Sequence, residues 1–299
     1  MSVRYSEQRQ EKTAIDLDHL RTWIGKTQCD EDRISARQAQ LMAATVDYPE
    51  PQRLRDGAAL PPLWHWIYFL EGRPAAQLGR DGHPARGGFL PPVPLPNRMW
   101  AGGRLRFLAP LPIGAQVRKL SRILAIEHKT GRSGDLVFVT VLHELCMPDG
   151  EPLVREEHDI VYKGHAPASG SAGQGAPAVS GLSPESGFRR TIVPTSTTLF
   201  RYSALTFNGH RIHYDADYCR EVEGYRNLVI HGPLNATLLA AFAEEVAGAR
   251  LSEFKYRGLA PAILGDSINL LAKVQGAGVE LSAVLGDGTL CMQAEAVMV

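Results

Sequence analysis

The stretch 233–247, PLNATLLAAFAEEVA, is apolar around most of the surface that it would present as a helix. Such a helix is stable only where other elements enclose it, because it has no broad polar face to meet water. Four stretches with the composition of strands follow it, at 253–257, 267–275, 279–285 and 290–297. A turn at Asp287 and Gly288 precedes the last of them. The sequence therefore predicts a central helix wrapped by an antiparallel sheet.

The first half of the chain repeats part of this arrangement. Its strand candidates lie at 103–107, 116–127, 136–145 and 153–162. Arg106, Ala109, Pro110 and Gly114 recur as Arg257, Ala260, Pro261 and Gly265, all at one offset (257 − 106 = 151). One shared offset indicates duplication, with coincidence over so short a window as the alternative. We therefore expect an α+β fold of two similar halves, each a helix wrapped by an antiparallel sheet.

The boundary between the halves is expected at 164–187, a stretch of Gly, Ala, Ser and Pro with few groups to bury. It separates an N-terminal domain, 1–163, from a C-terminal domain, 188–299. The C-terminal domain begins with a strand candidate at 190–194.

Four further segments of the N-terminal domain have interpretable patterns. The stretch 13–28 predicts a short helix that ends near Gly25, and Ser35 is placed to cap a second helix over 36–46. The segment 63–70, LWHWIYFL, is expected to be buried. The stretch 82–98 is rich in proline and glycine, and we expect a long irregular loop of the kind that compact domains keep for function.

Composition excludes several classes of protein. The formal net charge is zero, so the overall charge does not favour nucleic acid or a membrane surface as a partner. The four cysteines, Cys29, Cys146, Cys219 and Cys291, include no CxxC pair, which argues against a cysteine metal site and a disulfide framework. The N-terminus is polar, and no stretch approaches the roughly 20 apolar residues of a membrane span. A soluble, cytoplasmic protein is expected.

Polar side chains gather in the stretch 202–215, shortly before the apolar helix. This stretch holds Asn208, His210, Arg211, His213, Tyr214 and Asp215. A second polar group, His231 and Gly232, stands at the start of the helix itself. A dense polar cluster beside a helix start is where a ligand site is expected.

These residues resemble the MaoC-like hydratase/dehydratase family of double hot-dog folds. The family has a Gly-Asp-x-Asn-Pro-x-His-x-Asp-like segment and then a His-Gly at the start of the central helix. On this chain the family's catalytic histidine falls on His213, its catalytic aspartate on Asn208 and its later aspartate on Asp215. The His-Gly falls on His231 and Gly232. Asn208 thus replaces the usual acid, and His210–Arg211 replaces Asn-Pro.

The variant FNGHRIHYD, together with GHPARGGFLPPVPLPNRMWAGG in the first half, resembles the branch that includes 3-methylfumaryl-CoA (mesaconyl-C4-CoA) and itaconyl-CoA hydratases. The resemblance implies a hydro-lyase, without a cofactor or metal, that reversibly hydrates a short, branched, dicarboxylic enoyl-CoA to citramalyl-CoA. The first half lacks an HxD motif, so the resemblance implies that it holds part of the acyl group or CoA. A homodimer is compatible with it.

Hydration needs a base, a positioned water, donors for the thioester oxygen and a proton for Cα. We expect His213 to be the base, with a structural core histidine as the alternative. Asn208 is expected to position the water or to fix a turn, and Asp215 to orient a histidine, to supply the missing acid or to cap the next segment. The helix start at His231 and Gly232 is expected to polarise the thioester carbonyl.

A second carboxylate on the substrate would need a guanidinium partner. Arg86, Arg98 and Arg104 are candidates, with an ordinary surface charge as the alternative for each, and we select Arg98. Two other functions stay open within the same fold: an acyl-CoA thioesterase and a hydratase/dehydratase of ordinary 3-hydroxyacyl thioesters. A module that binds acyl-CoA without catalysis is a further alternative.

Overall fold

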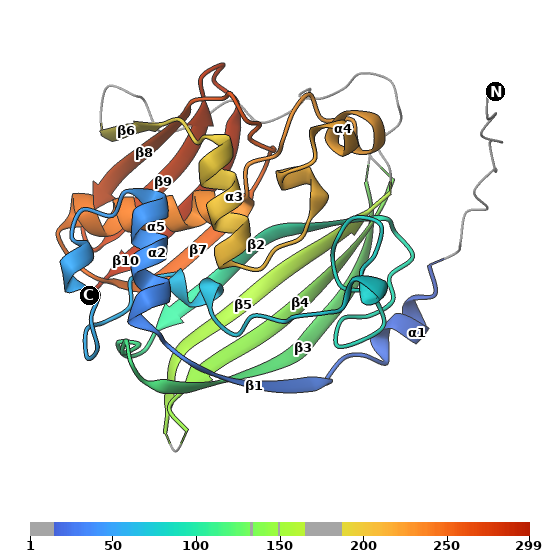
Figure 1. The fold of residues 1–299 in the computed structure, drawn as a ribbon, viewed down its shortest axis with the longest axis horizontal. Coiled ribbons are helices and arrows are strands. Elements are labelled where there is room, and N and C mark those ends of the chain that lie inside the picture. The colour runs from blue at the N-terminus through green and yellow to red at the C-terminus, as the bar shows by residue number, and fades with distance from the viewer. Residues whose placement is uncertain (1–14, 132–133, 149, 165–186) are drawn as a thin grey trace.

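The computed structural model describes residues 15–131, 134–148, 150–164 and 187–299. Within them, ten strands form one antiparallel sheet in the order β1-β3-β4-β5-β2-β7-β10-β9-β8-β6 (Figure 1). The strands are β1 (Thr27–Arg33), β2 (Asn97–Phe107), β3 (Gln116–Gly131), β4 (Gly134–Cys146), β5 (Pro152–Lys163), β6 (Phe188–Ile192), β7 (Leu251–Gly258), β8 (Ile268–Gln275), β9 (Gly278–Leu285) and β10 (Leu290–Met298). The helices are α1 (Leu17–Arg21), α2 (Ala36–Val46), α3 (Ser196–Leu205), α4 (Ala216–Tyr218) and α5 (Gly232–Ala247). The expected α+β double hot-dog architecture is confirmed.

The two halves meet where β2 pairs with β7, and the pairing keeps the offset of 151. Arg104 is opposite Lys255, and 255 − 104 = 151. Gly103 is opposite Tyr256, and Leu105 is opposite Phe254, so exchanging the halves maps one pair onto the other. The sheet therefore has a local two-fold relation centred on the Arg104–Lys255 pair, which supports the duplication inferred from the sequence.

Helix α5 lies against β7, β8, β9 and β10, as its apolar sequence requires (Figure 1). Leu234, Leu239 and Phe242 are buried in the main core. The helix begins directly after His231 and ends at Gly248, whose left-handed backbone (φ 63°) lets its N–H bind the Glu244 carbonyl. The central helix of the C-terminal half is thus confirmed.

The N-terminal half differs at the matching place. The offset of 151 maps 232–247 onto 81–96 (232 − 151 = 81; 247 − 151 = 96), and this segment contains no helix. It is the irregular loop that the prolines and glycines predicted. Helix α2 packs instead against α3 and the buried turn Trp64–Ile67 (Figure 1). The expectation of a wrapped helix in each half is therefore wrong for the first half, because proline-rich 82–98 cannot form one.

Local signals predicted some elements and missed others. Ser35 caps α2 through a bond from the Gln38 N–H, as expected. Strand β1 was missed because TQCDEDR is a polar edge strand with no apolar alternation. Helix α3 was missed although Thr195 and Thr198 form a capping box at its start. The predicted linker, 164–187, falls almost entirely outside the described residues.

None of the helices in the described parts of the chain is long and apolar enough to cross a membrane.

Candidate active site

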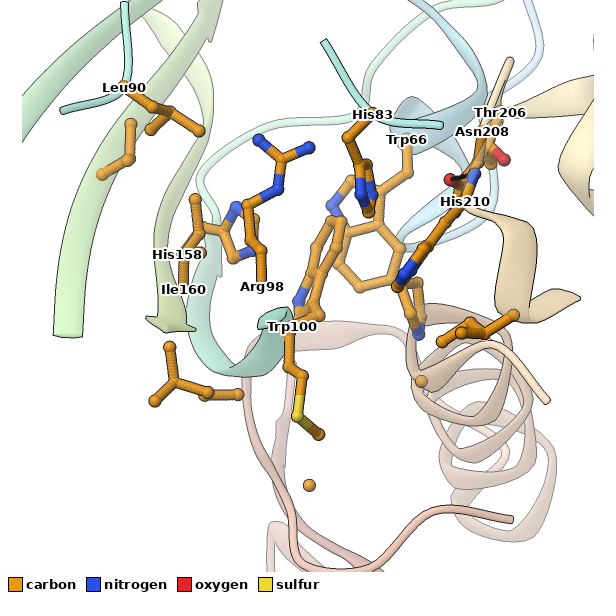
Figure 2. A pocket seen from close by; sticks show the side chains of 18 of the residues that line it. Trp66, His83, Leu90, Arg98, Trp100, His158, Ile160, Thr206, Asn208 and His210 are labelled. Atoms are coloured by element: carbon orange, nitrogen blue, oxygen red, sulfur yellow. Dashed lines mark hydrogen bonds between the residues drawn. The ribbon is translucent and has the colours of Figure 1, made fainter. Parts of the chain in front are cut away.

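A cavity of about 1090 Å³ lies between the two halves. Both halves contribute to its wall: His83, Arg98 and Trp100 come from the first, and Asn208 and His210 from the second (Figure 2). His213 and Gly232 also line it. The cavity therefore brings together four of the side chains or helix positions that the sequence singled out: Arg98, Asn208, His213 and Gly232.

The segment after α3 turns sharply into this cavity. The Asn208 N–H donates to the Ser203 carbonyl (2.8 Å), and the Asn208 side-chain oxygen accepts from the His210 N–H (3.0 Å). A short 3-10 turn, Arg211–His213, follows and leaves Ile212 and His213 buried. The side chain of Asn208 thus holds the turn that aims the histidines inward, and its NH₂ group is not used in that bond.

His213 has a defined tautomer. Its Nδ1 lies 2.7 Å from the Val229 carbonyl oxygen, which can only accept, so Nδ1 carries the proton and Nε2 is left as an acceptor. Burial lowers the pKa of His213 to about 4. At neutral pH the ring is therefore uncharged and able to take a proton.

His231 supports His213 from behind. The two rings stack, with centroids 3.6 Å apart and planes 18° apart. His231 is 1% exposed, and its Nε2 lies 2.8 Å from the Ser203 hydroxyl. Burial, and then the nearby imidazole of His213, hold the pKa of His231 well below its usual value. His231 is not among the residues that line the cavity, so it holds the His213 ring in place.

The start of α5 faces the cavity at Gly232. A side chain built on Gly232 would project into open space, with nothing within 4 Å. The N-cap residue, His231, makes no side-chain capping bond, so the first N–H groups of α5 keep their capacity to donate. This helix end offers N–H donors and a partial positive charge to an anionic oxygen in the cavity.

Asp215 has a different environment from the one expected of a catalytic acid. One carboxylate oxygen accepts from the Tyr218 N–H and caps α4, and the other binds Arg211 (2.7 Å). These bonds, the capping bond first, lower the pKa of Asp215. Asp215 does not line the cavity. One oxygen of Asp215 thus serves the capping alternative and the other binds Arg211, so these contacts favour capping over a catalytic role.

The three candidate arginines also separate clearly. Arg86 donates to the carbonyls of Val93, Leu95 and Pro96 and so holds its own loop. Arg104 pairs with Glu157 (2.8 Å) and Asp159 (2.7 Å).

Arg98 lines the cavity and, among the described residues, pairs with no carboxylate. Its contact is the phenol of Tyr162, whose pKa burial raises and the Arg98 charge lowers. Arg86 also lines the cavity, but both of its terminal nitrogens donate to backbone carbonyls, so Arg98 is the better candidate to bind a ligand there.

One model of a protein family, described as hydroxyacyl-thioester dehydratase type 2, matches residues 63–264. The chain is also 44% identical over 273 residues to the mesaconyl-C(4)-CoA hydratase of Chloroflexus aurantiacus, covering 91% of this chain and 95% of that protein. The chain belongs to the hydroxyacyl-thioester dehydratase type 2 family.

Further proteins are similar to this chain in sequence or in fold. The mitochondrial hydroxyacyl-thioester dehydratase type 2 of Schizosaccharomyces pombe is 26% identical over 243 residues, which are 73% of this chain and 79% of that protein. A MaoC-like dehydratase from Phytophthora capsici superposes with a TM-score of 0.68 at 15% identity, covering 95% of this chain and 99% of that one. A Mycobacterium tuberculosis protein described as a double hotdog fold has a TM-score of 0.57 at 12% identity, with 92% and 96% covered.

The sequence analysis of this dehydratase missed a group from the N-terminal half. Asp81 and His83 lie on the long loop, and the side-chain ligand atoms of Asp81, His83 and His210 all lie within 4.8 Å of one another. The signal was available, since GRDGHP places an acid and a histidine in a tight turn of a loop predicted to be functional.

Proposed function

We propose that this protein catalyses the reversible hydration of a short, branched, dicarboxylic enoyl-CoA. Mesaconyl-C4-CoA, giving citramalyl-CoA, is the first candidate substrate, and itaconyl-CoA is the second. The family and the 44% identical relative support this class of reaction. The observation that carries it is His213, a buried, neutral imidazole with a free Nε2 in a cavity that also contains the start of α5.

The chemistry begins at the water. His213 Nε2 removes one proton from a water molecule while the water oxygen bonds to Cβ. The π electrons of the double bond move to the thioester, and the enolate oxygen is stabilised by N–H groups at the start of α5, near Gly232. The side chain of Asn208 has two roles: its oxygen holds the turn, and its NH₂ group, which that bond does not use, positions the water.

Arg98 gives the site its preference for a second carboxylate. A guanidinium that lines the cavity and lacks a carboxylate partner among the described residues would bind the distal carboxylate of mesaconyl-C4-CoA through two parallel hydrogen bonds. This residue favours a dicarboxylic substrate over an ordinary 3-hydroxyacyl chain. The domain 1–163 would then hold the acyl group, and 188–299 would supply the base, His213, and the start of α5.

A substrate panel with one pair of enzymes tests the proposal. Wild type and Arg98→Met are compared on mesaconyl-C4-CoA, itaconyl-CoA and crotonyl-CoA, with products identified by mass spectrometry and free CoA measured with a thiol reagent. Wild type should hydrate a dicarboxylic substrate without releasing CoA. Arg98→Met should lose roughly 10- to 150-fold in kcat/KM on that substrate, the value of a charged hydrogen bond, and keep its rate on crotonyl-CoA. Equal losses on both substrates contradict the role of Arg98, and CoA release contradicts hydration.

A further inference from the structure

The site described so far has a base and an oxyanion donor but no acid. Asn208 stands at the position of the family's aspartate, and both oxygens of Asp215 are bound elsewhere. The carboxylate that does stand beside the histidines belongs to the other half. Asp81 Oδ2 lies 2.9 Å from His83 Nδ1, and the side chain of His83 is 19% exposed and lines the cavity (Figure 2).

The backbone fixes this loop on the catalytic segment. A side chain on Gly82 would lie 2.0 Å from the Gly209 carbonyl oxygen, and one on Gly209 would lie 2.8 Å from the Gly82 carbonyl oxygen. The Arg211 N–H donates to the Asp81 carbonyl (2.9 Å). Two glycines therefore permit a backbone approach that no other residue pair allows, and this approach sets the position of His83.

Four imidazole rings then follow one another along this side of the site. The centroids of His83 and His210 are 4.2 Å apart, those of His210 and His213 are 5.5 Å apart, and those of His213 and His231 are 3.6 Å apart. His83 forms one end of this histidine row, backed by Asp81. A carboxylate can only accept, so His83 Nδ1 donates to Asp81 and Nε2 is left to act in the cavity.

We propose that His83 is the second proton-transfer residue of this enzyme, delivering the proton to Cα, and that Asp81 is its positioning residue and counter-charge. The loop of the N-terminal half thus replaces the acid that the motif lost at Asn208. The inference rests on the proposed hydration.

The step balances with one proton. The water O–H bond breaks and His213 Nε2 receives the proton, while the C–O bond forms at Cβ and the π pair becomes the enolate. The proton passes through His210 to His83, where the Asp81 carboxylate balances its charge. Transfer from His83 Nε2 to Cα then forms the C–H bond and leaves His213, His210 and His83 neutral again.

The charges around His83 suit this role. Burial lowers the pKa of His83, the Asp81 carboxylate raises it, and the guanidinium groups of Arg98 and Arg86 lower it. His210, on the other side, has its pKa held low by burial and by its imidazole neighbours, His83 and His213. The row is therefore neutral at rest, and the only end with a balancing carboxylate is His83.

A metal ion is the alternative occupant of Asp81, His83 and His210. In this structure Asp81 Oδ2 accepts a hydrogen bond from His83 Nδ1, so neither of these two atoms has a lone pair directed to an ion. The pair is organised as an acid–base dyad, in which the carboxylate fixes the tautomer of the ring.

Exchange of the Cα proton in D₂O distinguishes the role of His83 from that of His213. The wild-type protein incubated with citramalyl-CoA should exchange this proton and eliminate water. His213→Gln should still exchange it without eliminating, because His83 remains. His83→Gln should lose about 10²- to 10⁴-fold in both exchange and turnover, the usual contribution of a general acid–base group. Asp81→Asn keeps the ring but removes the charge, and should slow exchange roughly tenfold, one pKa unit.

The matched control is His128→Gln. His128 also forms a 2.9 Å histidine–carboxylate pair, with Asp135, but lies outside the cavity, so its loss should leave exchange and turnover unchanged. If His83→Gln exchanges the Cα proton at the wild-type rate, or if His213→Gln no longer exchanges it, the role of His83 is contradicted while the proposed hydration stands. A stoichiometric metal in the purified protein whose removal by a chelator stops exchange also contradicts that role. A wild type that hydrates no enoyl-CoA overturns the proposed function, and this inference falls with it.

Discussion

The two halves share a strand pair and an offset of 151, yet they differ in the segment that precedes that pair. Before β7 stands the buried helix α5, and before β2 stands the irregular stretch 81–96 (Figure 1). Replacing a packed helix by a loop gives up apolar burial in that half. It also leaves space beside the sheet for a cavity and frees a backbone that can reach the other half. The two halves thus differ at this position: one has a packed helix, and the other has a loop that lines the cavity.

Both halves contain buried histidines, but the hydrogen bonds of these histidines differ between the halves. His213 faces the cavity with a free Nε2 beside the start of α5. On the sheet of the first half, His143 binds the Ser121 hydroxyl (2.8 Å), and the buried Glu156 binds His65 and Trp66. His65 and Glu156 therefore belong to a polar network of the fold, and His143, although it also lines the cavity, has its Nδ1 bound to Ser121, whereas His213 directs an unprotonated Nε2 to the cavity.

The largest effect should come from His213. His213→Gln removes the base and should lower kcat for hydration by about 10²- to 10⁴-fold, with the fold retained. His143→Gln changes a ring of the other half that also lines the cavity but has its Nδ1 bound to the Ser121 hydroxyl, and it should reduce kcat far less. Steady-state kinetics of the purified variants, with circular dichroism for folding, make the comparison.

Asp215→Asn is the control within the same segment, since Asp215 caps α4 and does not line the cavity. Its rate should stay close to that of wild type. Similar losses in His213→Gln and His143→Gln would show that the two halves do not divide their roles in this way.

The second effect tests whether the loop must touch the other half. Gly82→Ala places a methyl group 2.0 Å from the Gly209 carbonyl oxygen, so the loop has to move away. A displacement of about 1 Å in a catalytic group typically costs about 10²-fold in rate, and kcat should fall by that order.

Gly87→Ala is the matched control for Gly82→Ala. Gly87 has the same kind of backbone (φ +92°, against +86° at Gly82), but its nearest contact would be Pro92 at 3.8 Å. It should show only the backbone cost, roughly 1–2 kcal/mol of stability, and keep kcat. Equal kcat in the two variants would mean that contact between loop and site is dispensable.

The difference between helix α5 and the loop of the first half also shows what the sequence could predict. The apolar pattern of 233–247 determines a buried helix, and the prolines of 82–98 exclude one, so both local outcomes follow from composition. His213, Asn208 and Gly232 were found because they lie close together in the chain and resemble a known motif. In the structure all three line one cavity.

The missed features depend on contacts between distant residues. Asp81 reaches His210 only because Gly82 and Gly209 allow two backbones to meet, and no periodicity records such a contact. Asp215 matched the family's motif, but the nearby Arg211 and the start of α4 determine what its oxygens bind. The sequence shows which side chains can transfer a proton, but which of them reach the cavity depends on tertiary packing.

The smallest effect concerns stability, and it compares buried histidines in the two halves. Burial lowers the pKa of His143 to about 3 and that of His213 to about 4. Between pH 6.5 and pH 5 the unfolded chain therefore binds protons that the folded protein does not, so the free energy of unfolding falls as pH falls. Each such histidine should contribute up to about 1.4 kcal/mol per pH unit. Carboxylates contribute little to this slope because they titrate mainly below pH 5.

Removing one histidine should flatten this slope. Urea unfolding of His143→Gln at pH 6.5 and pH 5 should show a stability loss smaller by about 1–2 kcal/mol than that of wild type. His213→Gln should flatten the slope similarly, and only that variant should also lose turnover. An unchanged slope in His143→Gln would mean that this ring is already protonated in the folded state, and the N-terminal sheet would then hold a buried charge that Glu156 balances.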